Sequence, residues 1–212
     1  MLGFPTQVRF LLFPVLLVLL MAALHFFVDQ GSLVFSTQQV ASGEVWRIFT
    51  GQLLHTNDNH LLLNIAGLAL VWALHGEHYQ YGKFVAILVL ALFFVGIGTY
   101  FSATASSYYG LSGVLHFFLA WGACLDIKYL DRPIKEAKLT FYAIANHTGI
   151  LLLTGLILKV IFENTLGGTE ETAALIGATV AVEVHAIGVF SATLIFALLH
   201  IYGQKKGQDN LP

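Results

Sequence analysis

The chain has 212 residues, of which 57% are hydrophobic and only 10% charged, with a formal net charge of −2. A soluble domain carries about 25% charged residues, so this composition excludes a single core wrapped in a polar surface and indicates a protein of the lipid bilayer. The small net charge indicates no nucleic-acid partner, and the single cysteine, Cys124, excludes an intramolecular disulfide.

Six apolar segments, separated by short polar breaks, each predict a transmembrane helix, because roughly 20 apolar residues cross about 30 Å of hydrocarbon. They lie near Phe10–Val28, His60–His75, Phe84–Phe101, Leu111–Leu125, Leu139–Phe162 and Val184–Tyr202. The first is longer than the apolar region of a secretory signal peptide, and no small-residue cleavage site follows it cleanly, so we expect it to be retained. No internal repeat or linker divides the chain, which predicts one domain over residues 1–212: an all-α polytopic membrane protein with a six-transmembrane-helix bundle.

The distribution of lysine and arginine predicts the orientation of this bundle. With both termini on one side, that side holds Arg9, Lys83, Lys128, Arg132, Lys135, Lys138, Lys205 and Lys206. The other side holds only Arg47 and Lys159. Because basic residues concentrate in cytoplasmic loops, both termini are predicted to be cytoplasmic. The second, fourth and sixth segments then begin on the outward side.

Each of these three segments begins with polar residues of a kind that supports catalysis. The second carries His60 and Asn64, four residues apart and therefore on one helix face, with His55 upstream. The fourth begins at Ser112, and the sixth carries His185 near its outer end. These side chains should therefore lie at similar depth.

The fourth segment is short for a span. Its 15 residues, Leu111 to Leu125, give about 22 Å of helix against about 30 Å of hydrocarbon. Ser112 should therefore lie below the outer surface. Irregular backbone at that depth is tolerated where it lines a water-filled cavity or is buried in protein.

Serine chemistry needs the residue types that gather at this depth. A serine hydroxyl becomes an effective nucleophile when a neighbouring base accepts its proton, and His185 is the candidate base for Ser112. Donors for the developing oxyanion are available from the backbone N–H of Ser112, at a helix N-terminus, and from the side chains of His60 and Asn64.

Glycines near these residues would allow close helix packing. Gly110 and Gly113 flank the candidate nucleophile, and Gly188 with Ala192 forms a small-residue step one turn after His185. We expect this step to hold the sixth helix against the fourth.

Four short motifs together resemble the rhomboid family of intramembrane serine proteases. They are "VWR" at Val45–Arg47, "HTNDNHLLLN" at His55–Asn64, "GLSG" at Gly110–Gly113 and "HAIG" at His185–Gly188. The stretches "YYGLSGVLH", "VAVEVHAIG" and "LKVIFENTLGG" look most like the rhombosortase branch. The resemblance implies a Ser112–His185 dyad, with His60 and Asn64 at the oxyanion. It also implies structural or lipid-facing roles for Trp46 and Arg47.

The resemblance further implies the substrate class and the cellular location. Rhombosortases are associated with single-pass membrane proteins that carry a C-terminal Gly-Gly motif, a transmembrane helix and a basic cluster, a tail named GlyGly-CTERM. The expected activity is cleavage of that tail near the outer face of the bacterial inner membrane, through an acyl-enzyme, with the active site open to the periplasm. No metal or cofactor is expected, and "HGEH" at His75–His78 lacks the H-E-x-x-H spacing of a metalloprotease.

Two other functions remain open from the sequence. One is a catalytically inactive rhomboid-like chaperone or adaptor, although such a protein should lack the serine or the histidine. The other is a b-type haem protein using His60 and His185, which leaves Ser112 unexplained.

Several polar residues carry no firm role. His116 lies four residues after Ser112 and could face the same cavity, whereas Lys159 and Glu163 have the spacing of a local ion pair. No role is assigned to His147 or Glu183. The outer segment Gly167–Glu183 predicts either a mobile cap over the cavity or a plain extension of the sixth helix.

Overall fold

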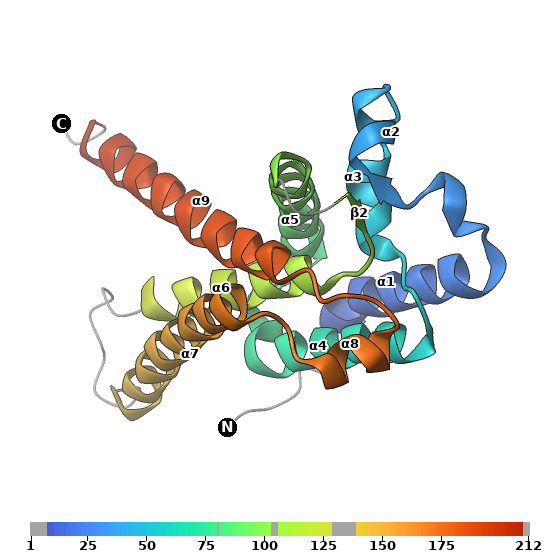
Figure 1. Ribbon diagram of the computed structural model, residues 1–212. Helices are drawn as coiled ribbons and strands as arrows, with labels where there is room; N and C mark the ends of the chain where they lie inside the picture. The colour runs from blue at the N-terminus through green and yellow to red at the C-terminus, as the bar shows by residue number, and fades with distance from the viewer. Residues whose placement is uncertain (1–7, 80, 103–105, 129–138, 210–212) are drawn as a thin grey trace.

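The computed structural model describes residues 8–79, 81–102, 106–128 and 139–209 (Figure 1). Each of the six predicted segments forms a helix. The long helices are α1 (Val8–Phe27), α4 (Asp58–His75), α5 (Tyr81–Phe101), α6 (Ser112–Lys128), α7 (Leu139–Leu166) and α9 (Val182–Asp209). The shorter elements are η1 (Gln30–Ser32), β1 (Phe35–Ser36), α2 (Thr37–Ala41), α3 (Arg47–Thr50), η2 (Gly51–Leu53), η3 (Gly76–His78), β2 (Ser107–Tyr108) and α8 (Glu170–Ile176).

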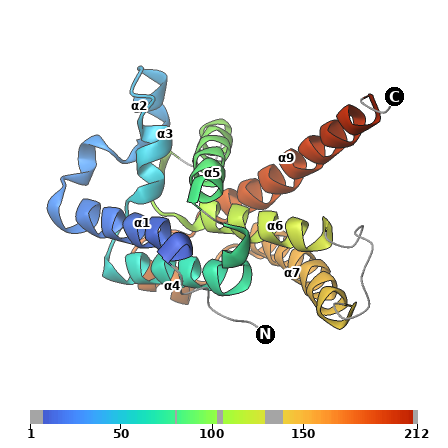
Figure 2. The same ribbon diagram turned by 180° about the vertical axis from the view of Figure 1, so that it is seen from behind.

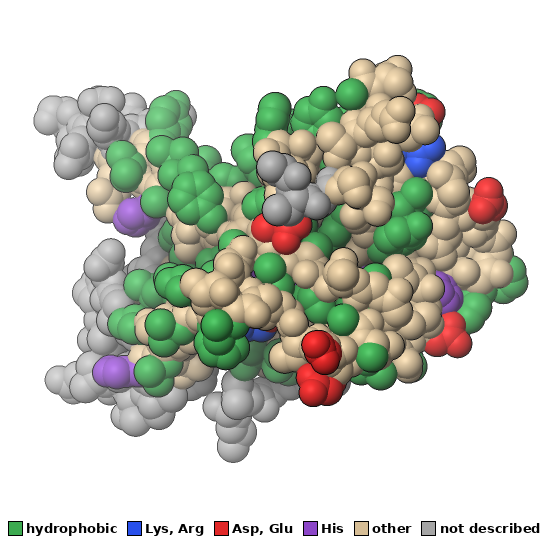
Figure 3. All heavy atoms as spheres, in the orientation of Figure 1, with side chains coloured by type: hydrophobic (Ala, Val, Ile, Leu, Met, Phe, Trp, Pro, Cys, Tyr) green, Lys and Arg blue, Asp and Glu red, His purple; other side chains and the backbone are tan. Residues whose placement is uncertain are grey.

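The helices have the length and surface of membrane spans. Among the described residues, five stretches are long and apolar enough to cross a bilayer: Phe10–Phe27, Asp58–His78, Gly82–Phe101, His147–Leu166 and Val182–Gln204. Large apolar side chains such as Leu151 and Phe190 are exposed, and Figure 3 shows hydrophobic side chains spread over much of the visible face. Exposed apolar surface of this kind is typical of helices that lie in a lipid bilayer. The architecture is that of an all-α polytopic membrane protein.

Helix α6 lies at the centre of the bundle. It packs against α4, α5, α7 and α9, as both views show (Figures 1 and 2). Phe117, Phe118 and Ala120 are fully buried within it. A helix that is apolar on all faces is expected in such a position. Helix α6 therefore begins within the bundle, at Ser112, which is itself partly exposed.

Small residues allow α6 and α9 to approach closely. A Cβ atom added to Gly188 would lie 2.2 Å from the carbonyl oxygen of Gly113, and one added to Gly113 would lie 2.6 Å from Val184 Cγ1. Ala192, one turn further along α9, is fully buried. The predicted small-residue step therefore lies in the α6–α9 contact.

Replacing Gly188 by alanine should therefore separate α6 from α9. Because the new methyl group would meet backbone rather than a flexible side chain, we expect a destabilisation of about 1–3 kcal/mol, measured as a lower unfolding midpoint in detergent. Gly155→Ala is the matched control, because no atom lies within 4 Å of a Cβ at that position. Equal midpoints for Gly188→Ala and the wild-type chain would contradict this packing.

The first loop is held by a buried arginine. Arg47 is only 6% exposed; it pairs with Glu44 at 2.6 Å and donates to the carbonyl oxygens of Gly31 and Val34 at 3.0 and 2.8 Å. Trp46 is about half exposed and donates to the Ser32 carbonyl oxygen at 3.3 Å. These contacts place Arg47 as a structural residue of the loop and Trp46 at its surface.

A short antiparallel ribbon joins this loop to the segment that precedes α6. In it, Phe35 of β1 is opposite Tyr108 of β2, and both residues are buried. The amide of Gly110 also donates to the carbonyl oxygen of Gly51. The backbone leading to Ser112 is therefore fixed by the first loop.

The segment between α7 and α9 forms a separate element. Helix α8 begins after Thr169, whose side chain accepts from the Thr172 amide, and ends at Gly177, which has a left-handed φ of 66°. The plain extension of the sixth helix is therefore wrong, because α9 begins only at Val182. Carbonyl oxygens at the end of α8 accept hydrogen bonds from Thr56, Asn57 and Asn59, which fasten α8 to the start of α4.

Candidate active site

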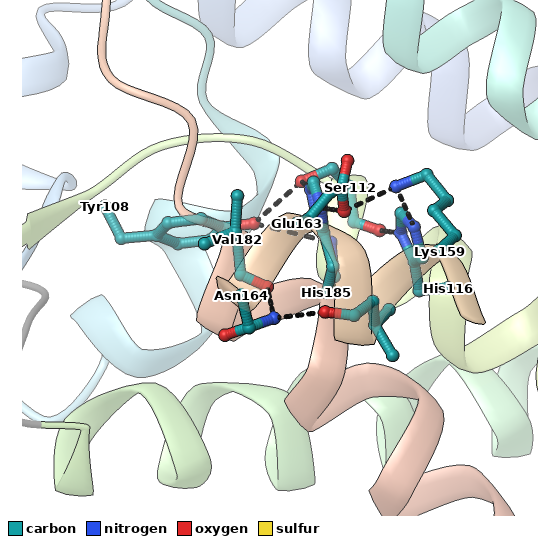
Figure 4. Close-up of polar contacts among 10 residues, drawn as sticks. Tyr108, Ser112, His116, Lys159, Glu163, Asn164, Val182 and His185 are labelled. Carbon is teal, nitrogen blue, oxygen red and sulfur yellow. Dashed lines mark hydrogen bonds and ion pairs between the residues drawn. The ribbon is translucent and has the colours of Figure 1, made fainter. Parts of the chain in front are cut away.

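The structure brings the two predicted catalytic side chains together. Ser112 Oγ lies 3.0 Å from His185 Nε2, which is hydrogen-bond distance (Figure 4). Ser112 is the first residue of α6, and His185 lies in the first turn of α9. Because the α6–α9 contact is tight at Gly113 and Gly188, it holds these two side chains in register.

The second ring nitrogen of His185 contacts a carboxylate. His185 Nδ1 lies 2.9 Å from Glu163 Oε2, near the C-terminal end of α7. An ionised carboxylate only accepts hydrogen bonds, so Nδ1 carries the ring proton. In the neutral ring, this leaves the lone pair of Nε2 directed at Ser112 Oγ.

A second histidine and a lysine complete this cluster. The His116 ring stacks on the His185 ring, with centroids 4.2 Å apart and planes 11° apart. His116 Nδ1 donates to the carbonyl oxygen of Ser112 at 2.7 Å, so its Nε2 accepts from the Lys159 ammonium at 3.1 Å. His116 therefore does face the site, in the neutral form. The predicted ion pair between Lys159 and Glu163 is present at 2.6 Å.

Tyr108 adds a hydroxyl that the sequence interpretation missed. Its phenol oxygen lies 3.4 Å from Ser112 Oγ and accepts from the Gly113 amide at 3.4 Å. Burial raises the pKa of Tyr108 to about 12, so the phenol stays neutral and can donate to Ser112 Oγ. The serine hydroxyl then keeps its own proton for His185.

The two predicted oxyanion side chains converge beside the loop that leads to Ser112. A Cβ added to Gly110 would lie 2.6 Å from His60 Nε2 and 3.5 Å from Asn64 Nδ2. Gly110 also has a φ of +113°, which side-chain-bearing residues rarely adopt. A glycine is therefore required here by both backbone conformation and space.

Hydrogen bonding shows whether His60 or Asn64 has a hydrogen available to donate to the oxyanion. The Thr56 hydroxyl donates to the carbonyl oxygen of Ile176, so it can only accept at its 2.9 Å contact with His60 Nδ1. A neutral His60 therefore presents an unprotonated Nε2 towards Gly110. Asn64 Nδ2 uses one hydrogen on the His60 carbonyl oxygen at 3.2 Å and keeps a second. Asn64 is the better placed side-chain donor.

His55 is buried against His60. It is 1% exposed, and its ring packs edge-on against His60 with centroids 5.1 Å apart. Burial lowers the pKa of His55 to about 3, with further contributions from His60 and His25, so the ring stays neutral. This position suits the predicted structural role in the cavity wall.

The described residues contain one group of three potential metal ligands, formed by His116, Glu163 and His185, whose ligand atoms lie within 4.8 Å of one another. The Lys159 ammonium is hydrogen-bonded to two of the three. A metal ion there would have to displace this cation. Both ring nitrogens of His185 also have partners, Ser112 and Glu163, so the haem interpretation gains no ligand nitrogen from it.

Sequence reasoning paired Glu163 only with Lys159 and did not anticipate its contact with His185. A signal was present, since Glu163 lies near the C-terminal end of the long helix that precedes the one carrying His185. Comparison of the chain with protein-family models gives no match, and comparison with curated proteins gives no match either.

Proposed function

We propose that the chain is an intramembrane serine protease of the rhomboid type, which cleaves single-pass membrane proteins near the outer face of the membrane. The observation that carries the proposal is the 3.0 Å contact between Ser112 Oγ and His185 Nε2, made at the ends of two packed apolar helices. A serine hydroxyl becomes an effective nucleophile when it is hydrogen-bonded to one nitrogen of an imidazole whose other nitrogen is held by a further group.

The acylation step follows from these contacts. Ser112 Oγ attacks the scissile carbonyl carbon while its proton passes to His185 Nε2. The carbonyl oxygen becomes an oxyanion, which the Ser112 amide and Asn64 Nδ2 stabilise. When the C–N bond breaks, His185 returns the proton to the leaving nitrogen, and the acyl group remains as an ester on Ser112.

Deacylation reverses the roles. A water molecule, or an amine, attacks the ester carbon and gives its proton to His185 Nε2. The bond between the ester carbon and Ser112 Oγ then breaks, and His185 returns the proton to the serine oxygen.

The short helix α6 supports a site that meets water within the membrane. Its 17 residues give about 25 Å of helix, less than the hydrocarbon thickness of about 30 Å. With both termini in the cytoplasm, as the basic residues favour, α6 is the fourth of six spans and Ser112 faces outward. In a bacterial inner membrane that side is the periplasm.

Apolar surface next to the site suits a transmembrane substrate. A shallow hollow along α7, lined by Leu151, Leu152, Gly155 and Leu156, ends at Lys159, whose ammonium contacts Glu163. The substrate class favoured by the motif resemblance is a protein with a C-terminal Gly-Gly motif, a transmembrane helix and a basic cluster.

Co-expression with a reporter carrying such a tail tests the proposal. We expect the reporter to be shortened at or near the Gly-Gly pair by the intact chain and to stay full-length with Ser112→Ala. A reporter with the Gly-Gly pair replaced by Leu-Leu separates tail recognition from general cleavage. Equal processing by the intact chain and Ser112→Ala would reject a serine mechanism.

A further inference from the structure

The carboxylate of Glu163 contacts His185 on the side of the ring opposite Ser112. Three separate helices thus contribute one group each: Ser112 from α6, Glu163 from α7 and His185 from α9 (Figure 4). The contacts run in sequence from Ser112 Oγ to His185 Nε2 at 3.0 Å and from His185 Nδ1 to Glu163 Oε2 at 2.9 Å.

We propose that Glu163 is a positioning residue, which holds His185 in the tautomer and orientation needed to accept the Ser112 proton. This role rests on the proposed function. It makes the site a Ser112–His185–Glu163 triad rather than a dyad. Glu163 itself keeps its charge throughout. The Ser112 proton moves to Nε2, the Nδ1 proton stays on the ring, and the resulting imidazolium is stabilised by the adjacent anion.

The burial of the three groups favours this role. His185 is 7% exposed, so a positive ring forming there is poorly solvated and needs a fixed anion close by. The Glu163 side chain is 20% exposed, which leaves it shielded from most of the solvent. The stacked His116 ring is neutral and closes one face of His185, which further limits rotation of the catalytic ring.

Two simpler roles for Glu163 make different predictions. As the ion-pair partner of Lys159, whose side chain is 44% exposed, it would contribute little, and removing Lys159 would have the same effect as removing Glu163. As a brace between α7 and α9, it would resemble its neighbour Asn164, which donates to the carbonyl oxygen of Val182 at 3.1 Å. Only the triad requires an anionic acceptor at His185 Nδ1.

The test compares kcat and KM for reporter cleavage by Glu163→Gln, Glu163→Asp and Glu163→Ala with those of Asn164→Ala. Glutamine keeps the size of the side chain but can offer an N–H to Nδ1 and so favour the wrong tautomer. We expect Glu163→Gln to lower kcat by about 10²–10⁴-fold with KM nearly unchanged. Glu163→Asp keeps the charge and should retain more activity than Glu163→Gln, despite its shorter reach.

Chemical rescue provides a measurement that a purely structural role would not change. The cavity left by Glu163→Ala can accept a small carboxylate, so added formate should raise kcat by about tenfold or more. Formate should have no effect on Ser112→Ala or Asn164→Ala. Asn164→Ala should lower the unfolding midpoint, because it removes a link between α7 and α9, and change kcat by less than about threefold.

The outcomes separate this inference from the proposed function. If Ser112→Ala is inactive while Glu163→Gln keeps its kcat, the triad is overturned and the serine protease stands. If Asn164→Ala or Lys159→Met loses as much kcat as Glu163→Gln, and Glu163→Ala does not respond to formate, Glu163 serves packing or ion pairing only and the triad is overturned. If Ser112→Ala keeps activity, the proposed function itself fails.

Discussion

Replacing Ser112 by alanine, or His185 by alanine, should abolish cleavage of a transmembrane reporter while the protein remains folded in the membrane. The two side chains lie 3.0 Å apart, and the proposed mechanism transfers one proton between them, so the loss of either stops the reaction. We expect kcat to fall by about 10⁴–10⁶-fold for either variant. Residues that act as one unit are non-additive, so the double variant should be little worse than either single one.

The controls for this prediction use residues of the same type outside the site. Ser107→Ala removes an exposed serine five residues before Ser112, and His200→Ala removes a histidine of α9 that forms a hydrogen bond with Gln204. Both should cleave the reporter at close to the wild-type rate. Losses in the Ser112 and His185 variants that multiply in the double variant would show that the two residues act independently, which would contradict the proposed catalytic pair.

Replacing Asn64 by alanine should produce the second-largest loss. Asn64 Nδ2 has a hydrogen to spare beside Gly110, so it can meet the oxyanion that forms on Ser112 attack. Losing one such donor lowers kcat by about 10²–10³-fold with a much smaller change in KM. Asn64→Asp, which keeps the shape but replaces the donors by oxygen, should be at least as inactive.

His60→Ala provides the comparison for this prediction. Since Thr56 fixes the ring proton of His60 at Nδ1, the ring has no hydrogen for the oxyanion, and its loss should reduce kcat less than that of Asn64. Equal losses would show that His60 donates through Nε2 and would overturn this tautomer. A raised KM with unchanged kcat in Asn64→Ala would make Asn64 a substrate-recognition residue.

The sequence predicted the long helices because apolar runs of membrane length leave few alternatives. The predicted and observed bounds of α4, near His60–His75 and at Asp58–His75, differ by two residues at one end only. Helix α8 was not predicted, because a seven-residue helix has too little periodicity to read. Contacts from the start of α4, which are distant in sequence, determine where it lies.

The site, like the fold, could be predicted from the sequence only in part. Ser112 and His185 could be paired from the sequence because the depth of each follows from its place along a span. The contact of Glu163 with His185 also depends on how α7 is rotated about its axis, which a sequence does not state. Tyr108 was missed for a related reason: it lies in a loop, and only the pairing of β2 with β1 directs it towards Ser112.

The most direct test of the account is covalent labelling of the intact, membrane-embedded protein with a fluorophosphonate, followed by peptide mass spectrometry. The serine oxygen displaces fluoride from phosphorus, so an activated serine gains a stable phosphonyl group. We expect the adduct on Ser112, and we expect it to disappear in His185→Ala. Labelling of another serine, or equal labelling of Ser112 with and without His185, would contradict the account.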